Sequence, residues 1–267
     1  MNGATAAADR FFEKIAEAQG SAMPLPIPPV TLLRGASLFL DFDGTLVEIA
    51  ERPDAVRVDA SLQALIKALH MRLHGRLVLI SGRPASEVRR LMGFYACTVV
   101  GSHGMEFKWA DGRAHAVDRP RGLDAALGAM RALAARLPGV VVEDKPLGAA
   151  LHFRQVPAAE PDCVALAQDL VDEHGLHLQH GKMVAEVRAA GSDKGGALGI
   201  VMAEPSFAGT RPVCMGDDLT DEPAFVSAAA LGGAGILVGS NRPSAAVYGL
   251  PDVATALAWL EAACEAV

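Results

Sequence analysis

Residues 36–45 read Ala-Ser-Leu-Phe-Leu-Asp-Phe-Asp-Gly-Thr, an apolar run that ends in two carboxylates and a glycine turn. The run predicts a buried β-strand, and the acidic pair then follows the point where that strand ends. Proteins of the α/β class build reactive sites at such strand ends. Because side chains repeat every two residues in an extended chain, Asp41 and Asp43 point the same way. One carboxylate can therefore act as a nucleophile while the other handles protons, and the pair favours a bound cation or a shared proton.

A lone acidic turn is the simplest alternative interpretation of Asp41 and Asp43, since Asp and Gly are common turn residues. A calcium-binding loop of the helix-loop-helix kind is excluded, because no glutamate closes a twelve-residue loop. The rest of the chain favours chemistry over a simple turn.

Further apolar runs at residues 77–80, 97–100, 211–215 and 236–239 predict more buried strands. Helical patterns follow several of them: one begins after Asp59, a second opens at Ser81-Gly82-Arg83-Pro84, and a third follows Ser192. Strands that alternate with helices predict an α/β fold with a doubly wound parallel sheet.

The pattern changes in the middle of the chain. Residues 105–117 predict a hairpin, and a helix over 123–137, strands over 140–145 and 150–155, a helix over 161–173 and two short strands follow. We interpret these elements as a small α+β unit with an antiparallel sheet, residues 109–190, inserted into a core of residues 33–108 and 191–267. Residues 1–32 predict a helix and a proline-rich tether.

Composition excludes several classes of protein. A length of 267 residues with 51% hydrophobic content allows a core with an insert and excludes disorder over most of the chain. The net charge of −7 argues against nucleic acid or an anionic membrane as partner, because both require a basic surface. The four cysteines lack paired spacing, residues 9–17 do not resemble a signal peptide, and no apolar run approaches a membrane span. We therefore expect a cytoplasmic protein.

A second acidic cluster lies beyond the predicted strand at 211–215. Asp217, Asp218, Asp221 and Glu222 are close in sequence and repel one another unless a hard cation joins them, and Mg²⁺ is the natural choice. Lys194 opens a helix and can reach the nucleophile to offset phosphate charge. Ser81 and the unobstructed amide of Gly82 suit a phosphate oxygen at a helix start.

The inserted unit carries charged side chains on short strands, which suit a hydroxyl-rich sugar. Alternation places Lys182 and Glu186 on one face of their strand. We expect nine residues to contact the substrate. Two belong to the turn at 81–84, Gly82 and Arg83, and the others are His103, Glu106, Lys145, His152, Arg154, Lys182 and Glu186. For His103 and His152 a half-buried structural role is an equal alternative.

Taken together, Asp-Phe-Asp-Gly-Thr-Leu, Ser-Gly-Arg, Gly-Ser-His-Gly-Met-Glu, Gly-Lys-Met-Val-Ala-Glu-Val-Arg, Ser-Asp-Lys-Gly and Gly-Asp-Asp-Leu-Thr-Asp-Glu resemble the trehalose-6-phosphate phosphatase family of the haloacid dehalogenase superfamily. The resemblance runs from about Leu33 to the C-terminus. It implies a Rossmann-like core with an α+β cap, Mg²⁺ as cofactor, and hydrolysis of trehalose 6-phosphate through an aspartyl-phosphate. It also implies a functional link to a trehalose-phosphate synthase.

By the same resemblance, Asp41 is the nucleophile, Asp43 the acid and base, and Ser81 and Lys194 bind phosphate. Asp41, Asp43 and Asp217 would hold the metal ion, with Asp218 and Asp221 orienting the ligands. Three alternatives remain open: a phosphatase of another sugar phosphate, such as a sucrose, glucosylglycerol or mannosylglycerate phosphate; a sugar-phosphate sensor without turnover; and a dehalogenase, which would not use Asp43 or the acidic cluster.

Overall fold

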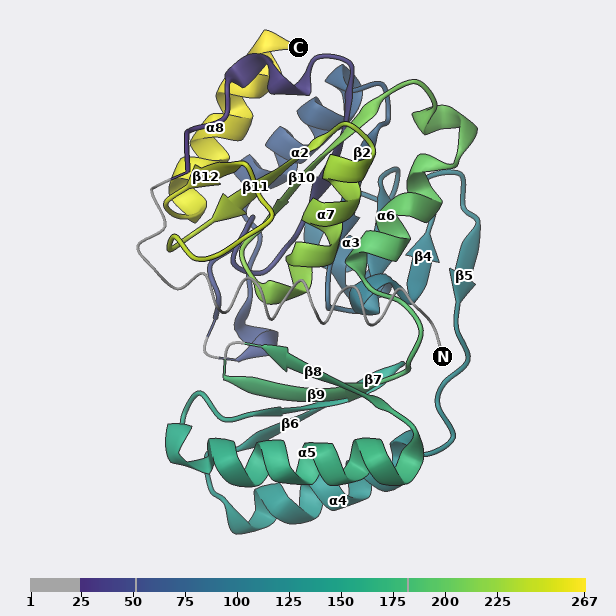
Figure 1. Cartoon of the computed structure of the whole chain (residues 1–267), viewed down its shortest axis with the longest axis vertical. Coiled ribbons are helices and arrows are strands. Elements are labelled where there is room, and N and C mark those ends of the chain that lie inside the picture. Colours follow the sequence, from purple (N-terminus) through teal and green to yellow (C-terminus); the bar gives the residue numbers. More distant parts are fainter. Residues whose placement is uncertain (1–24, 51, 182) are drawn as a thin grey trace.

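The computed structural model describes residues 25–50, 52–181 and 183–267 and divides them between two sheets (Figure 1). The large sheet has the strand order β12-β11-β10-β1-β2-β3-β4-β5. Its strands are β1 (Ala36–Leu40), β2 (Leu77–Ile80), β3 (Thr98–Gly101), β4 (Glu106–Lys108), β5 (Ala114–Ala116), β10 (Arg211–Gly216), β11 (Ala234–Val238) and β12 (Tyr248–Leu250). From β12 to β3 all neighbours are parallel.

Helices cover both faces of the large sheet, which confirms the doubly wound α/β prediction. The helices α2 (Ala60–Arg72), α3 (Ala85–Met92) and α8 (Val253–Ala266) share one hydrophobic cluster with β1 and β2. The helices α6 (Lys194–Met202) and α7 (Glu222–Ala230) pack in a second cluster on the opposite face. Strands buried on both faces need mostly apolar runs, which explains the sequence of β1, whose one polar side chain, Ser37, shares a hydrogen bond with Thr210. We call this part of the molecule the core.

Local caps fix where several helices begin. Asp59 accepts the N–H of Leu62 at 2.8 Å ahead of α2, and Asp252 accepts the N–H of Thr255 at 2.7 Å ahead of α8. Each carboxylate satisfies one of the free amides of a helix start. The extended residues 25–29 lie against the core, where Trp259 Nε1 donates to the Pro28 carbonyl at 2.7 Å.

Both strands of the hairpin at residues 105–117 belong to the large sheet: β4 lies within the expected core range of 33–108, whereas β5 lies in the range expected for the inserted unit. β4 pairs antiparallel with β3, and β5 with β4. The physical reason is burial: Phe107 stacks on Trp109 with ring centroids 5.6 Å apart, and both rings join the apolar cluster of α6 and α7. The hairpin therefore extends the core sheet.

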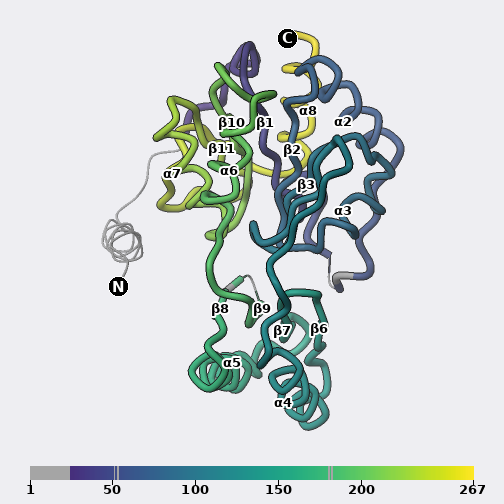
Figure 2. The backbone as a smooth tube through the Cα atoms, turned by 90° about the vertical axis from the view of Figure 1, so that its right-hand side faces the viewer, coloured from purple at the N-terminus to yellow at the C-terminus, as the bar shows by residue number. Residues whose placement is uncertain are grey.

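The small sheet has the order β6-β7-β9-β8 and is antiparallel throughout. Its strands are β6 (Val141–Lys145), β7 (Gly148–His152), β8 (His177–Gly181) and β9 (Val184–Arg188), and α4 (Leu123–Arg136) and α5 (Glu160–His174) cover its outer face. We call α4 through β9 the cap. It is inserted between β5 and α6, and two connections join it to the core (Figure 2). The expected inserted α+β unit is thus present, while its boundaries at 109 and 190 stay predictions.

Short 3₁₀ turns complete the described chain: η1 (Val30–Leu33), η2 (Pro53–Ala55), η3 (Ser102–Gly104), η4 (Pro157–Ala159), η5 (Pro205–Phe207) and η6 (Leu219–Asp221).

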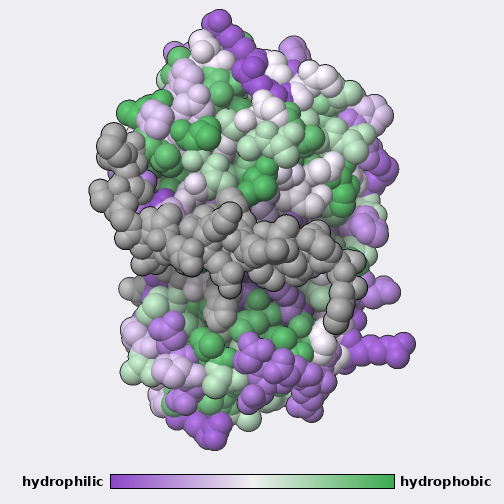
Figure 3. Space-filling view, viewed as in Figure 1, coloured by the Kyte–Doolittle hydropathy of each residue, from purple (hydrophilic) through white to green (hydrophobic). Residues whose placement is uncertain are grey.

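Hydrophilic and hydrophobic residues are interspersed over core and cap on the face seen in Figure 3. None of the described helices is long and apolar enough to cross a membrane. All four cysteines are free and buried. The predicted N-terminal helix lies outside the described residues.

Candidate active site

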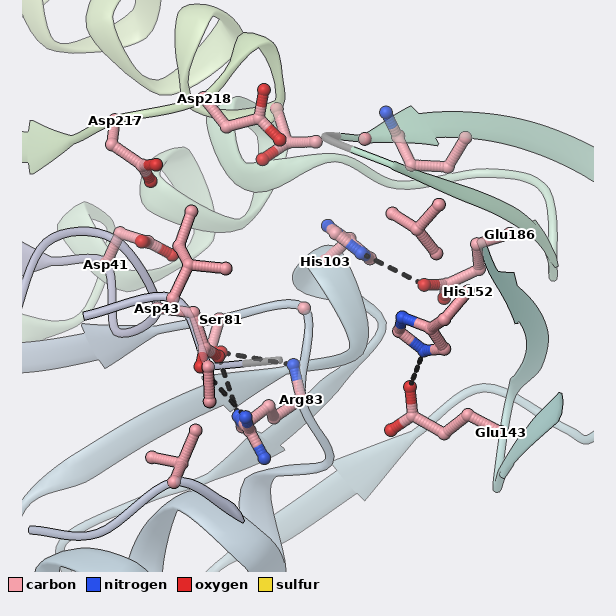
Figure 4. A pocket seen from close by; sticks show the side chains of 18 of the residues that line it. Asp41, Asp43, Ser81, Arg83, His103, Glu143, His152, Glu186, Asp217 and Asp218 are labelled. Atoms are coloured by element: carbon pink, nitrogen blue, oxygen red, sulfur yellow. Dashed lines mark hydrogen bonds and ion pairs between the residues drawn. The ribbon is translucent and has the colours of Figure 1, made fainter. Parts of the chain in front are cut away.

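A cavity lies between the carboxyl ends of the core strands and the inner face of the cap sheet (Figure 4). Core and cap both contribute to its lining. Of the residues predicted from sequence, it is lined by Asp41, Asp43, Ser81, Gly82, Arg83, His103, Lys145, His152, Arg154, Glu186, Lys194, Asp217 and Asp218. Segments more than a hundred residues apart in the chain therefore meet in one place.

Asp41 follows β1 and is held by the ammonium group of Lys194. The distance from Lys194 Nζ to Asp41 Oδ1 is 2.6 Å, and the same nitrogen lies 2.6 Å from Asp221 Oδ1. Asp41, Lys194 and Asp221 are all buried. Burial works against the charge on Lys194, but Asp221 and Asp41 outweigh it and raise the pKa of Lys194, so the ammonium form is retained.

Asp221 organises the acidic loop after β10. Its Oδ2 accepts the backbone N–H groups of Asp217 and Asp218, each at 3.1 Å. A Cβ on Gly216 would lie 2.2 Å from the Asp221 carboxyl carbon, so glycine is required for this packing. With one oxygen on Lys194 and the other on two amides, Asp221 orients the loop from beneath the cavity.

Asp41, Asp217 and Asp221 offer carboxylate oxygens within 4.8 Å of one another, which fits a hard cation. Burial raises the pKa of Asp41 to about 7 despite the opposing charge of Lys194. Burial, followed by the charges of Asp41 and Asp221, raises the pKa of Asp217 to about 8. Both carboxylates are therefore costly to keep ionised without a further positive charge. The donor set fits Mg²⁺, since this ion takes oxygen ligands.

Gly44 makes room for the Asp217 carboxylate. A Cβ at this position would lie 2.1 Å from Asp217 Oδ2, and the backbone φ of +87° disfavours other residues. The glycine turn after β1 therefore allows the acidic loop that carries Asp217 to lie close to Asp41 and Asp43.

The turn after β2 presents Ser81 and Arg83 to the cavity. Ser81 Oγ accepts the backbone N–H of Arg83 at 3.1 Å, which leaves the hydroxyl proton available to donate. The Arg83 guanidinium donates to both oxygens of Asp43 and, through Nη1, to Glu87 at 2.6 Å. Arg83 lines the cavity as predicted, and these contacts make it a partner of Asp43.

The cap contributes a chain of alternating charges on its inner face. Lys145 and Glu186 form a buried ion pair, and Lys145 Nζ lies 3.9 Å from Glu143 Oε2. His152 Nε2 lies 2.8 Å from the same Glu143 oxygen. Burial raises the pKa of Glu186, but Lys145 and His103 outweigh it and lower the pKa to about 2. The inner face therefore carries fixed charges suited to hydroxyl groups.

Two predicted residues do not reach the cavity. Glu106 is buried in the core, where its Oε1 accepts the N–H of Ala85 at 2.6 Å and the hydroxyl of Ser102 at 3.0 Å. Its predicted contact with substrate is therefore corrected to a role inside the core. Asp221 lies beneath the cavity, and Lys182 falls outside the described residues.

Glu143 is the main lining residue that the sequence analysis did not single out. The signal was present, because Glu143 and Lys145 lie two residues apart on β6 and share a face. Gln179 and Arg52 also line the cavity, on segments without a distinctive motif. Thr220 lines it as well and lies within the Gly-Asp-Asp-Leu-Thr-Asp-Glu motif, but was not singled out there. Arg242 was missed as well: it pairs with buried Glu222 and donates to the Asp218 carbonyl at 2.8 Å, bracing the acidic loop from outside.

Comparisons with known proteins agree with this geometry. Residues 39–254 match the family model for trehalose-phosphatase. The chain is 36% identical over 229 residues to a probable trehalose-phosphate phosphatase of Sinorhizobium fredii, covering 85% of this chain and 86% of that protein. It is also 36% identical over 227 residues to the trehalose-6-phosphate phosphatase of Escherichia coli, covering 84% of each.

Solved structures agree in fold. A crystal structure of a trehalose-6-phosphate phosphatase related protein matches with a TM-score of 0.70 and 27% identity, covering 84% of this chain and 95% of the other. The C-terminal domain of the trehalose-6-phosphate phosphatase of C. albicans matches with a TM-score of 0.80 at 21% identity, covering 92% of this chain and all of that domain, which bears on the fold alone. The chain therefore belongs to the trehalose-phosphatase family, a family of phosphoric monoester hydrolases within the haloacid dehalogenase superfamily.

Proposed function

We propose that this protein hydrolyses trehalose 6-phosphate to trehalose and inorganic phosphate, with Mg²⁺ as cofactor and a phosphoryl group carried on Asp41. One observation carries the proposal: a buried, lysine-held aspartate at the end of β1 faces the charged inner surface of the cap across one cavity. The first element suits phosphoryl transfer, and the second suits a sugar.

Asp41 is the proposed nucleophile. Lys194 holds Asp41 Oδ1, which leaves Oδ2 for attack on phosphorus in line with the sugar oxygen. As the bond from Asp41 to phosphorus forms, the bond from phosphorus to the sugar oxygen breaks, and Asp43 gives its proton to that oxygen. Water then attacks phosphorus, Asp43 takes the proton of that water, and the bond to Asp41 breaks to release phosphate.

Ser81 and Lys194 are the proposed phosphate contacts. The Ser81 hydroxyl has its acceptor oxygen occupied by the Arg83 amide and its proton free for a phosphate oxygen. Lys194 supplies positive charge between Asp41 and Asp221, where charge accumulates on the phosphoryl group.

Asp41 and Asp217 would hold Mg²⁺ with the backbone carbonyl of Asp43, while Asp218 and Asp221 would orient the loop. When bound, the ion supplies positive charge that offsets repulsion between the carboxylates and the phosphate oxygens. The support on the chain is the carboxylate cluster, together with the glycines that make room for it.

The cap would recognise the sugar through Glu143, Lys145 and Glu186, with His152, Arg154 and Lys182 as further contacts. Charged groups make strong, directional hydrogen bonds to hydroxyls, and the cavity brings them opposite the phosphate site. Glycosyl transfer to a sugar phosphate yields a disaccharide phosphate of this kind, so a functional link to a trehalose-phosphate synthase remains part of the proposal.

The test is phosphate release from a panel of esters: trehalose, sucrose, glucosylglycerol and mannosylglycerate phosphates, each with Mg²⁺ and with chelator. We expect trehalose 6-phosphate to be cleaved with the highest kcat/KM of the panel, and only when Mg²⁺ is present. Asp41→Asn should abolish turnover, and circular dichroism should show that this variant keeps the wild-type fold. Preference for another ester would overturn the substrate, and turnover by Asp41→Asn would overturn the mechanism.

A further inference from the structure

The turn that joins β3 to β4 has a strained backbone. Ser102 and His103 both adopt positive φ angles, 50° and 56°, and Gly104 follows at 102°. Only the last of these is a glycine, and the left-handed region is unfavourable for residues with a Cβ. Two backbone bonds hold the turn: Ser102 N–H to the Arg83 carbonyl at 2.9 Å, and His103 N–H to the Ser81 carbonyl at 3.0 Å.

Glu106 strengthens the same connection. Its Oε1 accepts from the Ser102 hydroxyl and from the Ala85 amide, so one buried carboxylate joins the strained turn to the start of α3. A side chain on Gly104 is excluded by the Asp193 carbonyl, which would lie 2.5 Å from its Cβ. The strain is therefore imposed by the surrounding core, a pattern that is found at functional sites.

The effect of this backbone is to direct the His103 imidazole out of the core toward the cap. One side of the ring lies on Gly82, where a Cβ would approach Nε2 and Cε1 to 2.6 Å. The ring nitrogen Nε2 lies 3.6 Å from Glu186 Oε2 on β9 (Figure 4). Buried Nδ1 has no hydrogen-bond partner among the described residues, which is a cost to stability at this ring.

Glu186 thus has partners from both parts of the molecule. Lys145 reaches it from within the cap sheet, and His103 reaches it from the core. The contact with His103 exists only while the cap lies over the core, whereas the ion pair with Lys145 moves with the cap.

His152 provides the contrast. It faces Glu143 at 2.8 Å, and both residues belong to the cap, on the neighbouring strands β7 and β6. Their pairing does not depend on where the cap lies. The two cap carboxylates therefore each face one imidazole, but only the pair of His103 and Glu186 spans the two parts.

We propose that His103 is a positioning residue that links closure of the cap to recognition of the sugar, because its contact with Glu186 forms only when cap and core meet. This inference rests on the proposed function for its kinetic consequence. Its structural consequence, a higher population of the open form when His103 is removed, is independent of the substrate.

The test compares His103→Ala and His103→Gln with His152→Ala as the matched control, all in the full chain. With trehalose 6-phosphate we expect His103→Ala to raise KM about tenfold or more, and the glutamine variant to recover part of the loss because its amide can donate to Glu186. With p-nitrophenyl phosphate, which has no sugar, His103→Ala should lower kcat/KM several-fold less than it does with trehalose 6-phosphate.

Hydrogen exchange of the two connections between core and cap, residues 117–122 and 189–193, gives the second readout. We expect faster exchange there in His103→Ala and wild-type exchange in His152→Ala, although His152→Ala should also raise KM for the sugar phosphate. Unchanged exchange in His103→Ala, or an equal loss on both esters, would overturn the proposal. If wild-type protein failed to cleave trehalose 6-phosphate, the proposed function would fall while the exchange result still decided the role of His103.

Discussion

The guanidinium of Arg83 engages both carboxylate oxygens of Asp43, with distances of 2.6 Å from Nε to Oδ2 and 2.8 Å from Nη2 to Oδ1. Such a two-point contact fixes the plane of the carboxylate as well as its position. The proposed acid and base of the reaction is therefore oriented by the same turn that carries Ser81, the proposed phosphate contact.

Arg83→Lys should lower kcat about tenfold with little change in KM, since a lysine ammonium cannot match both oxygens of Asp43. The measurement is steady-state kinetics on trehalose 6-phosphate. Arg90→Lys, exposed on α3 just after the turn that carries Arg83, is the control and should behave as the wild type. Wild-type kcat in Arg83→Lys would show that the orientation of Asp43 is set by other groups.

Asp217→Asn should raise the melting temperature of metal-free protein and remove its response to Mg²⁺. Burial, followed by repulsion from Asp41, raises the pKa of Asp217, and neutralising Asp217 removes both costs of its charge. Wild-type protein in chelator should melt lower and gain stability as Mg²⁺ is added, because a ligand of the folded state stabilises it. Asp169→Asn, exposed on α5, should keep the Mg²⁺ response. Equal responses in both variants would argue against Asp217 as a ligand.

Gly44→Ala should abolish turnover and Mg²⁺-dependent stabilisation. The added methyl group occupies the place of the Asp217 carboxylate. Gly112→Ala is a matched control, because its φ of +91° imposes the same backbone strain but no atom lies within 4 Å of the added Cβ. Both variants should lose about 1 kcal/mol of stability to strain, measured by urea unfolding, and only Gly44→Ala should lose activity. Loss of activity in both would mean that strain alone is responsible.

Glu186→Gln should destabilise the protein by about 3 kcal/mol at pH 7, because buried Lys145 loses its partner. The pKa of Glu186 is lowered from 4.5 to about 2 in the folded state, so its ionisation contributes stability that is complete above pH 4.5 and lost as the pH falls toward 2. The stability difference between wild type and variant should therefore narrow over that window in thermal melts. Glu173→Gln, exposed on α5, should show a constant difference near zero.

Much of the fold could be predicted from the local sequence. The apolar runs that became β1, β2, β10 and β11 are buried along nearly their whole length, and in a parallel sheet covered on both sides burial requires such runs. The cavity-lining residues directly after β1, β2 and β10 were predictable for the same reason, since strand ends in this fold meet at one edge.

Local sequence could not predict which of two possible partners a strand or side chain would pack against. The hairpin of β4 and β5 has the same alternation whether it joins the core or the cap, and the burial of Phe107 and Trp109 decided for the core. Glu106 lies in a motif with His103, but their side chains separate: Glu106 turns inward to Ala85, and His103 turns toward the cap.

The sequence by itself determined which residues stand at the ends of the strands and which chemical groups they bring, because strand burial and the two-residue repeat are local properties. Only the tertiary structure decided which groups meet. Lys194 reaches Asp41 across 153 residues, Arg83 turns to Asp43, and His103 reaches Glu186 from the other part of the molecule. Such contacts depend on how distant segments pack together, and no local pattern encodes that.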